Sequence, residues 1–568
     1  MKRKLATLIL TAVLAMNTIA CSATAKTSST TVTNTTTSQT TSQTTSNNST
    51  AIDALDSANL FSKKDKEIEY DEKTSKTIKL NNESITISEE GTYIFSGTIT
   101  NGQVIVDAPK EAKITLVLDS VSINNDTSAA IYVKQADKVF ITLAKNSINT
   151  LSNKSEFIAI DDNNIDGVIF SKDDLTLNGQ GKLIINANYG NGIVSKDDLI
   201  ITSGDYEITA ANHGLQGKDN VKISDGNITI KATKDAIHSE NSDDTSLGYV
   251  YIGGGNLNLT SSSDAIDSSS IVQIDNGTIN ITADDDGIHS DGRLIINGGK
   301  INILQSNEGL EGEKVDITGG EINVISKDDG LNATSGSSTT NTQAQDNSQS
   351  SENTQKQSKK ERPTPPQGGQ MLNSSNRPKP PQDGQMPNSS NRPEPPQDGQ
   401  MPPHMGGGMD EVQENAYINI TGGTITIKAG GDGVDSNGNI TVSGGTTYVY
   451  GPTNDGNGSL DYNGAATISS GTFITAGSSG MAQNFGNDST QGSILLNLSS
   501  SKNEGTKVTV TNSSGKAILT FTPQTKYNSL LISSPDIKQG EQYTITAGDE
   551  TQTVEMTSNI YSSNERHR

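Results

Sequence analysis

Apolar and polar residues alternate along most of this chain, in short stretches separated by pairs of small residues. Ile, Val or Leu occupies every second position of a stretch, and Asn, Thr or Asp stands between them. Alternation of this kind places the apolar side chains on one face of a β-strand. The Gly-Gly and Asn-Gly pairs between stretches supply backbone with positive φ, which is typical of tight corners. We therefore predict an all-β protein built from strands and corners.

A small residue also recurs at the start of each unit, and its spacing defines a repeat. It stands at Gly192, Gly214, Ala236, Ala265, Gly287, Gly309 and Gly330, in steps that are mostly 22 residues. A period in this range indicates a solenoid, because one unit cannot bury its own apolar face and stacked units can. The pattern predicts a parallel β-helix with coils of about 22 residues. A β-propeller, the alternative, needs blades of about 40 residues and Trp-Asp signatures, whereas this chain has no Trp.

Breaks in the repeat divide the chain into segments. We expect a signal peptide at 1–21, a disordered Ser/Thr-rich tether at 22–59, an N-terminal cap with irregular coils at 60–153, the regular β-helix at 154–490, an antiparallel β module at 491–556 and a disordered tail at 557–568. A disordered Pro/Gln/Ser-rich insertion at 334–413 interrupts the helix. Removing about 80 residues between Gly330 and Gly433 restores the normal spacing of one coil. The insertion should therefore project from a single coil, at a corner. The shorter insertion at 240–248 should leave at the same corner.

Charge and the N-terminal residues indicate an exported protein. The net charge of −24 argues against nucleic acid and against anionic membrane surfaces. Basic residues precede an apolar run at 5–16, which is typical of a secretory signal. Cys21, the lone cysteine, follows this run, so we expect it to be lipidated and to anchor a monomer at the outer cell surface. The alternative is cleavage after Ala25, which would release the protein.

Acidic residues form two columns at one predicted corner, three residues apart in each coil. Stacked carboxylates repel, and calcium prefers several oxygen ligands, so the columns predict Ca²⁺ sites. The candidate ligands are Asp235, Asp264, Asp267, Asp285, Asp286, Glu308, Glu311, Asp328, Asp329, Asp432 and Asp435. The alternative is that each Asp merely caps a turn.

Other residues permit catalytic interpretations that the spacing supports less well. His213, His238 and His289 occupy related corner positions, but His213 and His289 are three coils apart and cannot share one metal. Lys196 and Lys218 lie beside acids, as the base of an acidic-polysaccharide lyase would. Lys172 and Lys196 occur in the identical sequence Ser-Lys-Asp-Asp-Leu, however, which is typical of residues that stack on successive coils for structural reasons. We assign no catalytic residue.

Several contiguous stretches resemble the secreted clostridial carbohydrate-binding-domain family. The most specific are 115–119, 191–198, 211–214 and 532–536, and the resemblance covers about residues 60–555. It implies a calcium-containing, right-handed parallel β-helix that binds cellulose or acidic sugars. The function expected from it is non-catalytic binding of plant-cell-wall polysaccharide at the cell surface. A lyase of acidic polysaccharides and a surface adhesin or spacer remain the alternatives.

Overall fold

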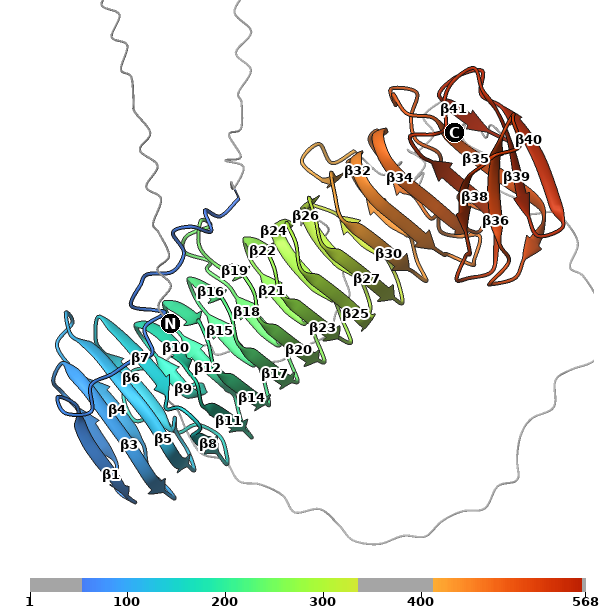
Figure 1. Cartoon of the computed structure of the whole chain (residues 1–568). Coiled ribbons are helices and arrows are strands. Elements are labelled where there is room, and N and C mark those ends of the chain that lie inside the picture. The colour runs from blue at the N-terminus through green and yellow to red at the C-terminus, as the bar shows by residue number, and fades with distance from the viewer. Residues whose placement is uncertain (1–53, 336–411, 564–568) are drawn as a thin grey trace, which may run out of the picture. The chain divides into compact units, whose positions relative to one another are not determined.

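The computed structural model describes residues 54–335 and 412–563, and this part of the chain is all-β (Figure 1). One hydrogen-bonded sheet joins 37 strands, nearly all in parallel, and a separate antiparallel sheet holds four more. The chain therefore folds as the predicted parallel β-helix, in which the backbone groups of each coil pair with the coils on either side. None of the described residues forms a helix long and apolar enough to cross a membrane.

Each full coil contributes a strand to three stacks. The first stack contains the short strands that begin at the recurring small residue. These are β2 (Ile85–Ile87), β4 (Val104–Asp107), β6 (Ile131–Gln135), β9 (Gly167–Ser171), β12 (Asn191–Ser195), β15 (Leu215–Gly217), β18 (Ile237–Ser239), β21 (Ile266–Ser268), β28 (Leu331–Ala333), β31 (Val434–Ser436), β33 (Asp461–Tyr462) and the first halves of β24 (Ile288–Ile296) and β26 (Leu310–Ile317).

The second stack follows the first after a corner. It contains β7 (Lys138–Leu143), β10 (Asp174–Gly179), β13 (Asp198–Ile201), β16 (Asn220–Ile223), β19 (Tyr249–Ile252), β22 (Ile271–Ile274), β29 (Tyr417–Ile420), the second halves of β24 and β26, and the first parts of β5 (Lys113–Asn125), β32 (Asn439–Tyr450) and β34 (Ala466–Gly477).

The third stack contains β8 (Ile148–Asn153), β11 (Lys182–Ala187), β14 (Asp205–Ala210), β17 (Asn227–Ala232), β20 (Asn256–Ser261), β23 (Thr278–Thr282), β25 (Lys300–Ser306), β27 (Glu321–Ser326), β30 (Thr424–Lys428) and the ends of β5, β32 and β34. Two strands, β1 (Lys76–Asn81) and β3 (Gly91–Ile99), lead into β5 at the N-terminal end.

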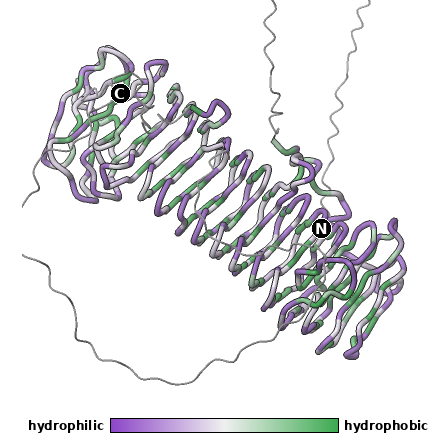
Figure 2. Tube along the Cα trace, turned by 180° about the vertical axis from the view of Figure 1, so that it is seen from behind, coloured by the Kyte–Doolittle hydropathy of each residue, from purple (hydrophilic) through white to green (hydrophobic). Residues whose placement is uncertain are grey.

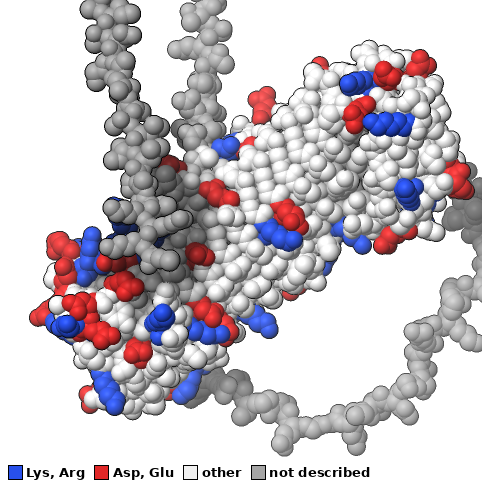
Figure 3. Space-filling view, viewed as in Figure 1, with Lys and Arg blue, Asp and Glu red and all other residues white. Residues whose placement is uncertain are grey.

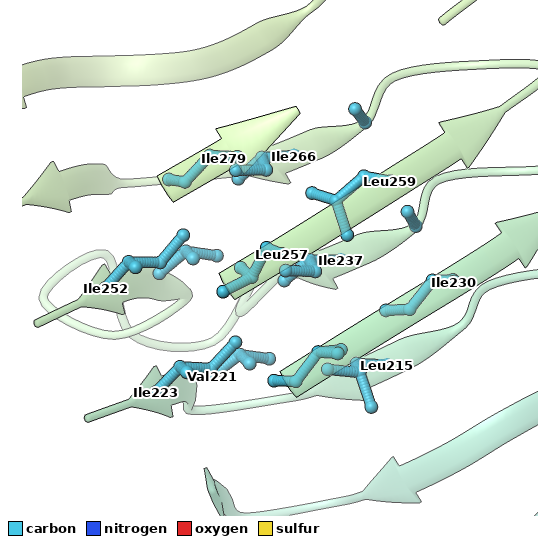
Figure 4. Close-up of a cluster of buried hydrophobic side chains, with 14 of the residues drawn as sticks. Leu215, Val221, Ile223, Ile230, Ile237, Ile252, Leu257, Leu259, Ile266 and Ile279 are labelled. Atoms are coloured by element: carbon cyan, nitrogen blue, oxygen red, sulfur yellow. The ribbon is translucent and has the colours of Figure 1, made fainter. Parts of the chain in front are cut away.

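The core is a continuous column of aliphatic side chains, because equivalent positions of successive coils face inward. In the third stack Ile230, Leu259 and Ile281 are in register and at most 2% exposed. Figure 4 shows such side chains from the three stacks meeting inside the helix. In Figure 2 hydrophobic and hydrophilic positions alternate along the coils, as the sequence pattern predicts.

Glycine forms the corner before the third stack because the coils approach one another closely there. Gly299 and Gly320 have φ of 87° and 93°, and a Cβ at Gly299 would lie 2.9 Å from the carbonyl oxygen of Gly277. A side chain at these positions would strain the backbone and push the coils apart. The recurring Gly pair therefore maintains the coil spacing.

The long insertion interrupts a single coil. Strand β26 pairs with β28 through its first half and with β29 through its second, so β28 and β29 belong to one coil. The insertion leaves this coil between Ala333 and Tyr417, and residues 336–411 lie outside the described part of the chain. Residues 240–248 leave between β18 and β19, which is the equivalent corner, as predicted.

A segment before β1 packs along the outside of the second stack, and we call residues 54–72 the strap. Leu55 N donates to Gln273 Oε1 at 2.8 Å, and Phe61 lies 5.9 Å from the Tyr251 ring. The tether expected up to residue 59 is therefore shorter, because 54–59 are held by these contacts. Residues 22–53 lie outside the described part.

The buried carboxylate of Asp65 fixes the strap. It lies 2.9 Å from Lys138 Nζ, accepts a hydrogen bond from Thr176 Oγ1 at 2.8 Å, and is only 2% exposed. Burial alone would raise the pKa of Asp65, but Ser62, Lys138 and Thr176 outweigh it and lower that pKa. The charged form of Asp65 is therefore the one that holds the strap.

A small antiparallel module covers the last coil, as predicted. Strand β38 (Tyr527–Ser533) pairs antiparallel with β34 and with β35 (Ser493–Lys502). A second sheet contains β36 (Val508–Asn512), β37 (Ala517–Phe521), β39 (Gln542–Ala547) and β40 (Glu550–Glu555). The tail expected to be disordered from 557 instead forms β41 (Ile560–Ser562), which pairs with β35. Because β34 pairs with β38, the edge of the last coil is not open to pairing with another chain.

We predict that Asp65→Ala releases the strap. The substitution leaves the Lys138 ammonium largely buried, and it should weaken docking by about 3 kcal/mol, since Asp174 remains near Lys138. Limited proteolysis should then cut within residues 54–72. Asp56→Ala, at an exposed site bonded only within its own turn, is the matched control. Because the folded pKa of Asp65 is lowered, wild-type protection should persist above pH about 4 and be lost below it. Equal cleavage of wild type and Asp65→Ala would contradict this assignment.

Candidate functional site

Two columns of polar side chains follow one edge of the first stack. The first column holds the residue before each small residue, and the second column holds the residue three positions later. The first column contains His213, Asp235, Asp264, Asp286, Glu308, Asp329 and Asp432. The second contains Gln216, His238, Asp267, His289, Glu311, Asn332 and Asp435, which the strand register places in line. Neighbouring members are separated by about one strand spacing, roughly 4.8 Å.

One oxygen of most first-column carboxylates serves the backbone of the next coil. Asp235 Oδ1 accepts from Asp264 N at 3.2 Å, and Asp264 Oδ1 accepts from Asp286 N at 2.8 Å. Asp329 Oδ1 accepts from Asp432 N at 2.6 Å in the same way. Turn capping, the alternative interpretation, thus accounts for one oxygen of each of these carboxylates, although the hydrogen bond comes from the backbone of the next coil. The other oxygen is available for a second role.

Towards the middle of the columns acids predominate, and His289 Nε2 lies 3.9 Å from Glu311 Oε2 at their edge. We call Asp286, Glu308, Glu311 and Asn332 the acidic group. Carboxylate oxygens of its three acids lie within 4.8 Å of one another, and so do those of Asp264, Asp285 and Asp286. Asn332 Nδ2 donates to Glu308 Oε2 at 2.8 Å. Its Oδ1 is buried and has no hydrogen-bond partner among the described residues.

The acidic group carries more negative charge than its surroundings neutralise. Burial and the close contact with Glu311 raise the pKa of Asp286 to about 9, and burial with the charge of Glu311 raises the pKa of Glu308 to about 7. Further along, burial raises the pKa of Asp329 to about 8 and that of Asp435 to about 7. Such shifts mean that the ionised acids repel one another.

The acidic group fits a hard divalent cation. The three carboxylates form an all-oxygen donor set, which calcium prefers, and turning the Asn332 amide over would add its free Oδ1 to that set. A bound cation would supply the missing positive charge and, once the amide is turned over, a partner for the buried Oδ1. Asp286, Glu308, Glu311 and Asn332 would hold it. This fit rests on donor chemistry and on the unpartnered oxygen.

The N-terminal part of the columns has a different composition. Asp235 Oδ2 lies 3.1 Å from Nδ1 of both His213 and His238, and Asp267 lies 2.7 Å from His238 Nδ1 and 2.9 Å from His289 Nδ1. Burial would lower the pKa of His238, but Asp235 and Asp267 raise it to about 9. Burial would raise the pKa of Asp267, whereas His238 and His289 lower it. Imidazoles thus neutralise Asp235 and Asp267, two of the predicted calcium ligands.

The remaining predicted calcium ligands lie beside the two columns or further along them. Asp285 and Asp328 are exposed one position before the first column. Asp432 follows Asp329 in the first column, and burial raises its pKa to about 6. The columns therefore bring Asp264, Asp285, Asp286, Glu308 and Glu311 together, and place Asp329 one coil, and Asp432 and Asp435 two coils, beyond Glu308.

A second group of acids at another corner was missed by the sequence interpretation. Oxygens of Asp174, Asp197 and Asp198 lie within 4.8 Å of one another, and burial with repulsion from Asp174 raises the pKa of Asp197 to about 7. Lys222 Nζ partly offsets this charge at 2.6 Å from Asp198 Oδ2. The repeated Ser-Lys-Asp-Asp text at 171–174 and 195–198 was the available signal, because it stacks the acids in register.

Comparison with known proteins relates part of this helix to a family. The model of the family "Carbohydrate-binding domain-containing protein" matches residues 81–330 and 282–347. This stretch of the chain is similar to the carbohydrate-binding domain family. A relative of that name from Acetivibrio thermocellus is 44% identical over 128 residues, which are 22% of this chain and 45% of the relative. The chain thus matches less than half of that relative's length.

A solved structure also matches the helix. It is titled a polysaccharide lyase-like protein from C. thermocellum, as a gadolinium derivative. The match has 38% sequence identity and a TM-score of 0.38, and it covers 39% of this chain and 96% of that chain. Within this chain, the carbohydrate-binding domain stretch includes the columns from His213 to Asn332, whereas Asp432 and Asp435 lie beyond it.

We predict that the metal-free protein loses stability as pH rises. Asp286 and Glu308 have folded pKa values of about 9 and about 7, above their ordinary values, so the folded state binds protons more tightly. The stability that protonated Asp286 and Glu308 contribute is fully present below pH about 4. It is lost as pH rises through the folded pKa values of the two acids. Thermal unfolding in chelator should show a falling Tm between pH 5 and pH 9.

Two variants isolate this effect. Asp286→Asn should flatten the fall in Tm, because it removes the most strongly shifted acid and relieves Glu308. Asp284→Asn, at an exposed acid two residues away, should leave the pH dependence unchanged. A Tm that rises with pH, or the same slope in both variants, would show that the acids do not repel one another in the folded state.

Proposed function

We propose that this protein binds extended polysaccharide on one flat face of the β-helix and that calcium stabilises the helix. The carbohydrate-binding domain family supports carbohydrate as the ligand class. The face is formed by the outward side chains of β20, β23, β25 and β27, which we call the amide face. The observation that carries the proposal is a ladder of asparagines along this face.

The asparagine ladder presents aligned hydrogen-bonding groups. Asn280 Nδ2 donates to Asn258 Oδ1 at 3.0 Å, Asn302 to Asn280 at 2.9 Å, and Asn323 to Asn302 at 3.1 Å. Each amide has two N–H groups, so the ladder bond leaves one for another partner. The ladder repeats at about 4.8 Å, close to the rise per sugar in an extended β-linked glycan. Sugar hydroxyls could therefore meet an amide at each step.

Apolar side chains flank the ladder and suit the C–H face of a sugar ring. Leu304 and Ile325, on neighbouring strands, are 57% and 49% exposed. The nearby charges of Lys300 and Glu321 pair with one another at 2.7 Å. In Figure 3 the surface over these strands carries few charged side chains. An uncharged, flat and partly apolar surface favours a neutral glycan such as cellulose over an acidic one.

Binding without cleavage agrees with the state of the candidate basic residues. Lys196 Nζ lies 3.3 Å from Asp166 Oδ2, and Lys218 Nζ lies 2.6 Å from Asp243 Oδ2. The hydrogen bond to Asp243 raises the pKa of Lys218, whereas a base that abstracts a proton at neutral pH needs a lowered one. We therefore propose a non-catalytic role. Ultraviolet-absorbing unsaturated product from polygalacturonate would overturn it.

Location at the cell surface is part of the same proposal. It rests on the export signal and on lipidation of Cys21, both outside the described residues. The insertion expected at 334–413 lies outside them as well, apart from its first and last residues. A spacer or adhesin would lose its activity when this insertion is deleted, whereas a glycan binder would retain it.

We predict that Asn280→Ala combined with Asn302→Ala weakens retention on insoluble cellulose. Each lost hydrogen bond costs about 0.5–1.5 kcal/mol, so Kd should rise about tenfold for the pair. Thr441→Ala combined with Ser443→Ala, at exposed positions outside the amide face, is the matched control. Equal retention of both double variants would exclude the amide face. Retention on polygalacturonate alone would show that the ligand is acidic.

We predict that calcium raises the Tm and that chelator lowers it. A cation bound only by the folded acidic group stabilises the protein by mass action, by about 2.7 kcal/mol at one hundred times its Kd. Glu308→Gln combined with Glu311→Gln should abolish the calcium increment, and it should not lower the Tm in chelator. Glu321→Gln, at an exposed acid, should keep the increment. Superimposed wild-type curves with and without calcium would refute the site.

A further inference from the structure

We propose that His213, Asp235 and His238 form a second metal site, which takes a zinc-type divalent transition-metal ion. These side chains come from two successive coils, and the coil of Asp264 and Asp267 separates them from the acidic group. Nδ1 of each histidine lies 3.1 Å from Asp235 Oδ2, and the three ligand atoms lie within 4.8 Å of one another. The imidazole rings stack with centroids 4.4 Å apart and planes inclined by 22°.

A nitrogen without a hydrogen bond points to a missing partner. His213 Nδ1 is buried and lies within ion-pair distance of Asp235 Oδ2, but within the described part of the chain it makes no well-directed hydrogen bond. The His213, His238 and Asp235 side chains are 13%, 12% and 7% exposed, so water reaches them poorly. An ion between the three ligand atoms would satisfy His213 Nδ1.

The donor types select the ion. Imidazole nitrogen suits zinc, nickel and copper, whereas calcium prefers oxygen ligands. Two imidazoles and one carboxylate also match a common zinc set that leaves a fourth position open. Three coils further on, the acidic group has only oxygen donors. The same two columns therefore provide two sites of different selectivity.

Asp267 lies beside the site in the next coil and shares His238 Nδ1 with it. Its Oδ2 lies 2.7 Å from His238 Nδ1, and its Oδ1 lies 2.9 Å from His289 Nδ1. When an ion takes His238 Nδ1, the proton on that nitrogen leaves for solvent, and Asp267 remains bound to His289. His289 itself is too far along the helix to join His213 at one ion, so the site takes two histidines.

Calorimetric titration of the full-length chain with Zn²⁺, in excess Ca²⁺ and without an affinity tag, tests the inference. We expect one zinc ion to bind per chain in the presence of calcium. His213→Ala and His238→Ala should each weaken zinc binding by more than the roughly 10–100-fold caused by loss of an outer partner. His404→Ala, at a histidine outside the described residues, is the matched control and should bind zinc as the wild type does.

Zinc-edge X-ray absorption of the loaded wild-type protein gives an answer that does not depend on variants folding. Two imidazole ligands and at least one oxygen are expected. An all-oxygen shell, displacement of zinc by calcium, or unchanged affinity in both histidine variants would overturn the site. Since no step here involves sugar, loss of glycan binding by the amide-face variants would leave the zinc result unaffected.

Discussion

In-register stacking of the coils is the constraint on which the rest of this structure depends. Each strand pairs residue for residue with its equivalents in the neighbouring coils, so a side chain repeated once per coil becomes a column at about 4.8 Å spacing. Ile columns become the core, Gly columns become corners, and Asn columns become a ladder. Ionisable residues in such columns interact strongly, whether by attraction or by repulsion.

This constraint explains why one edge of the helix has two kinds of chemistry. Where histidine and aspartate alternate between coils, as in His238 and Asp267, the charges neutralise one another. Where acids follow acids, as in Asp286 and Glu308, burial and repulsion raise their pKa values and favour a cation. On the third stack the outward residues are mostly uncharged amides and hydroxyls, which suit a neutral polymer. Position within the coil thus separates the proposed glycan face from the proposed metal sites.

Much of this arrangement could be predicted from the sequence, because a repeat fixes both period and register. The step of 29 residues between Ala236 and Ala265 correctly located an insertion at one corner, and the columns around Asp286 followed from the period alone. Contacts that no repeat encodes were not predictable. Docking of Asp65 against Lys138 and Thr176 joins a segment outside the repeat to distant coils. The pairing of Asp235 with His238 depends on side-chain conformations that bring residues of different columns together.

A double-mutant cycle on Asp286 and Glu308, measured by unfolding with and without calcium, tests most directly whether stacking couples the acids of successive coils. Without calcium, Asp286→Asn and Glu308→Gln should each relieve the same repulsion, so their effects should be less than additive, with a coupling of about 1 kcal/mol or more. With calcium the coupling should reverse its sign, because both acids then hold one ion. Additive effects in both conditions would contradict the account, since they would mean that the two columns are independent turn residues.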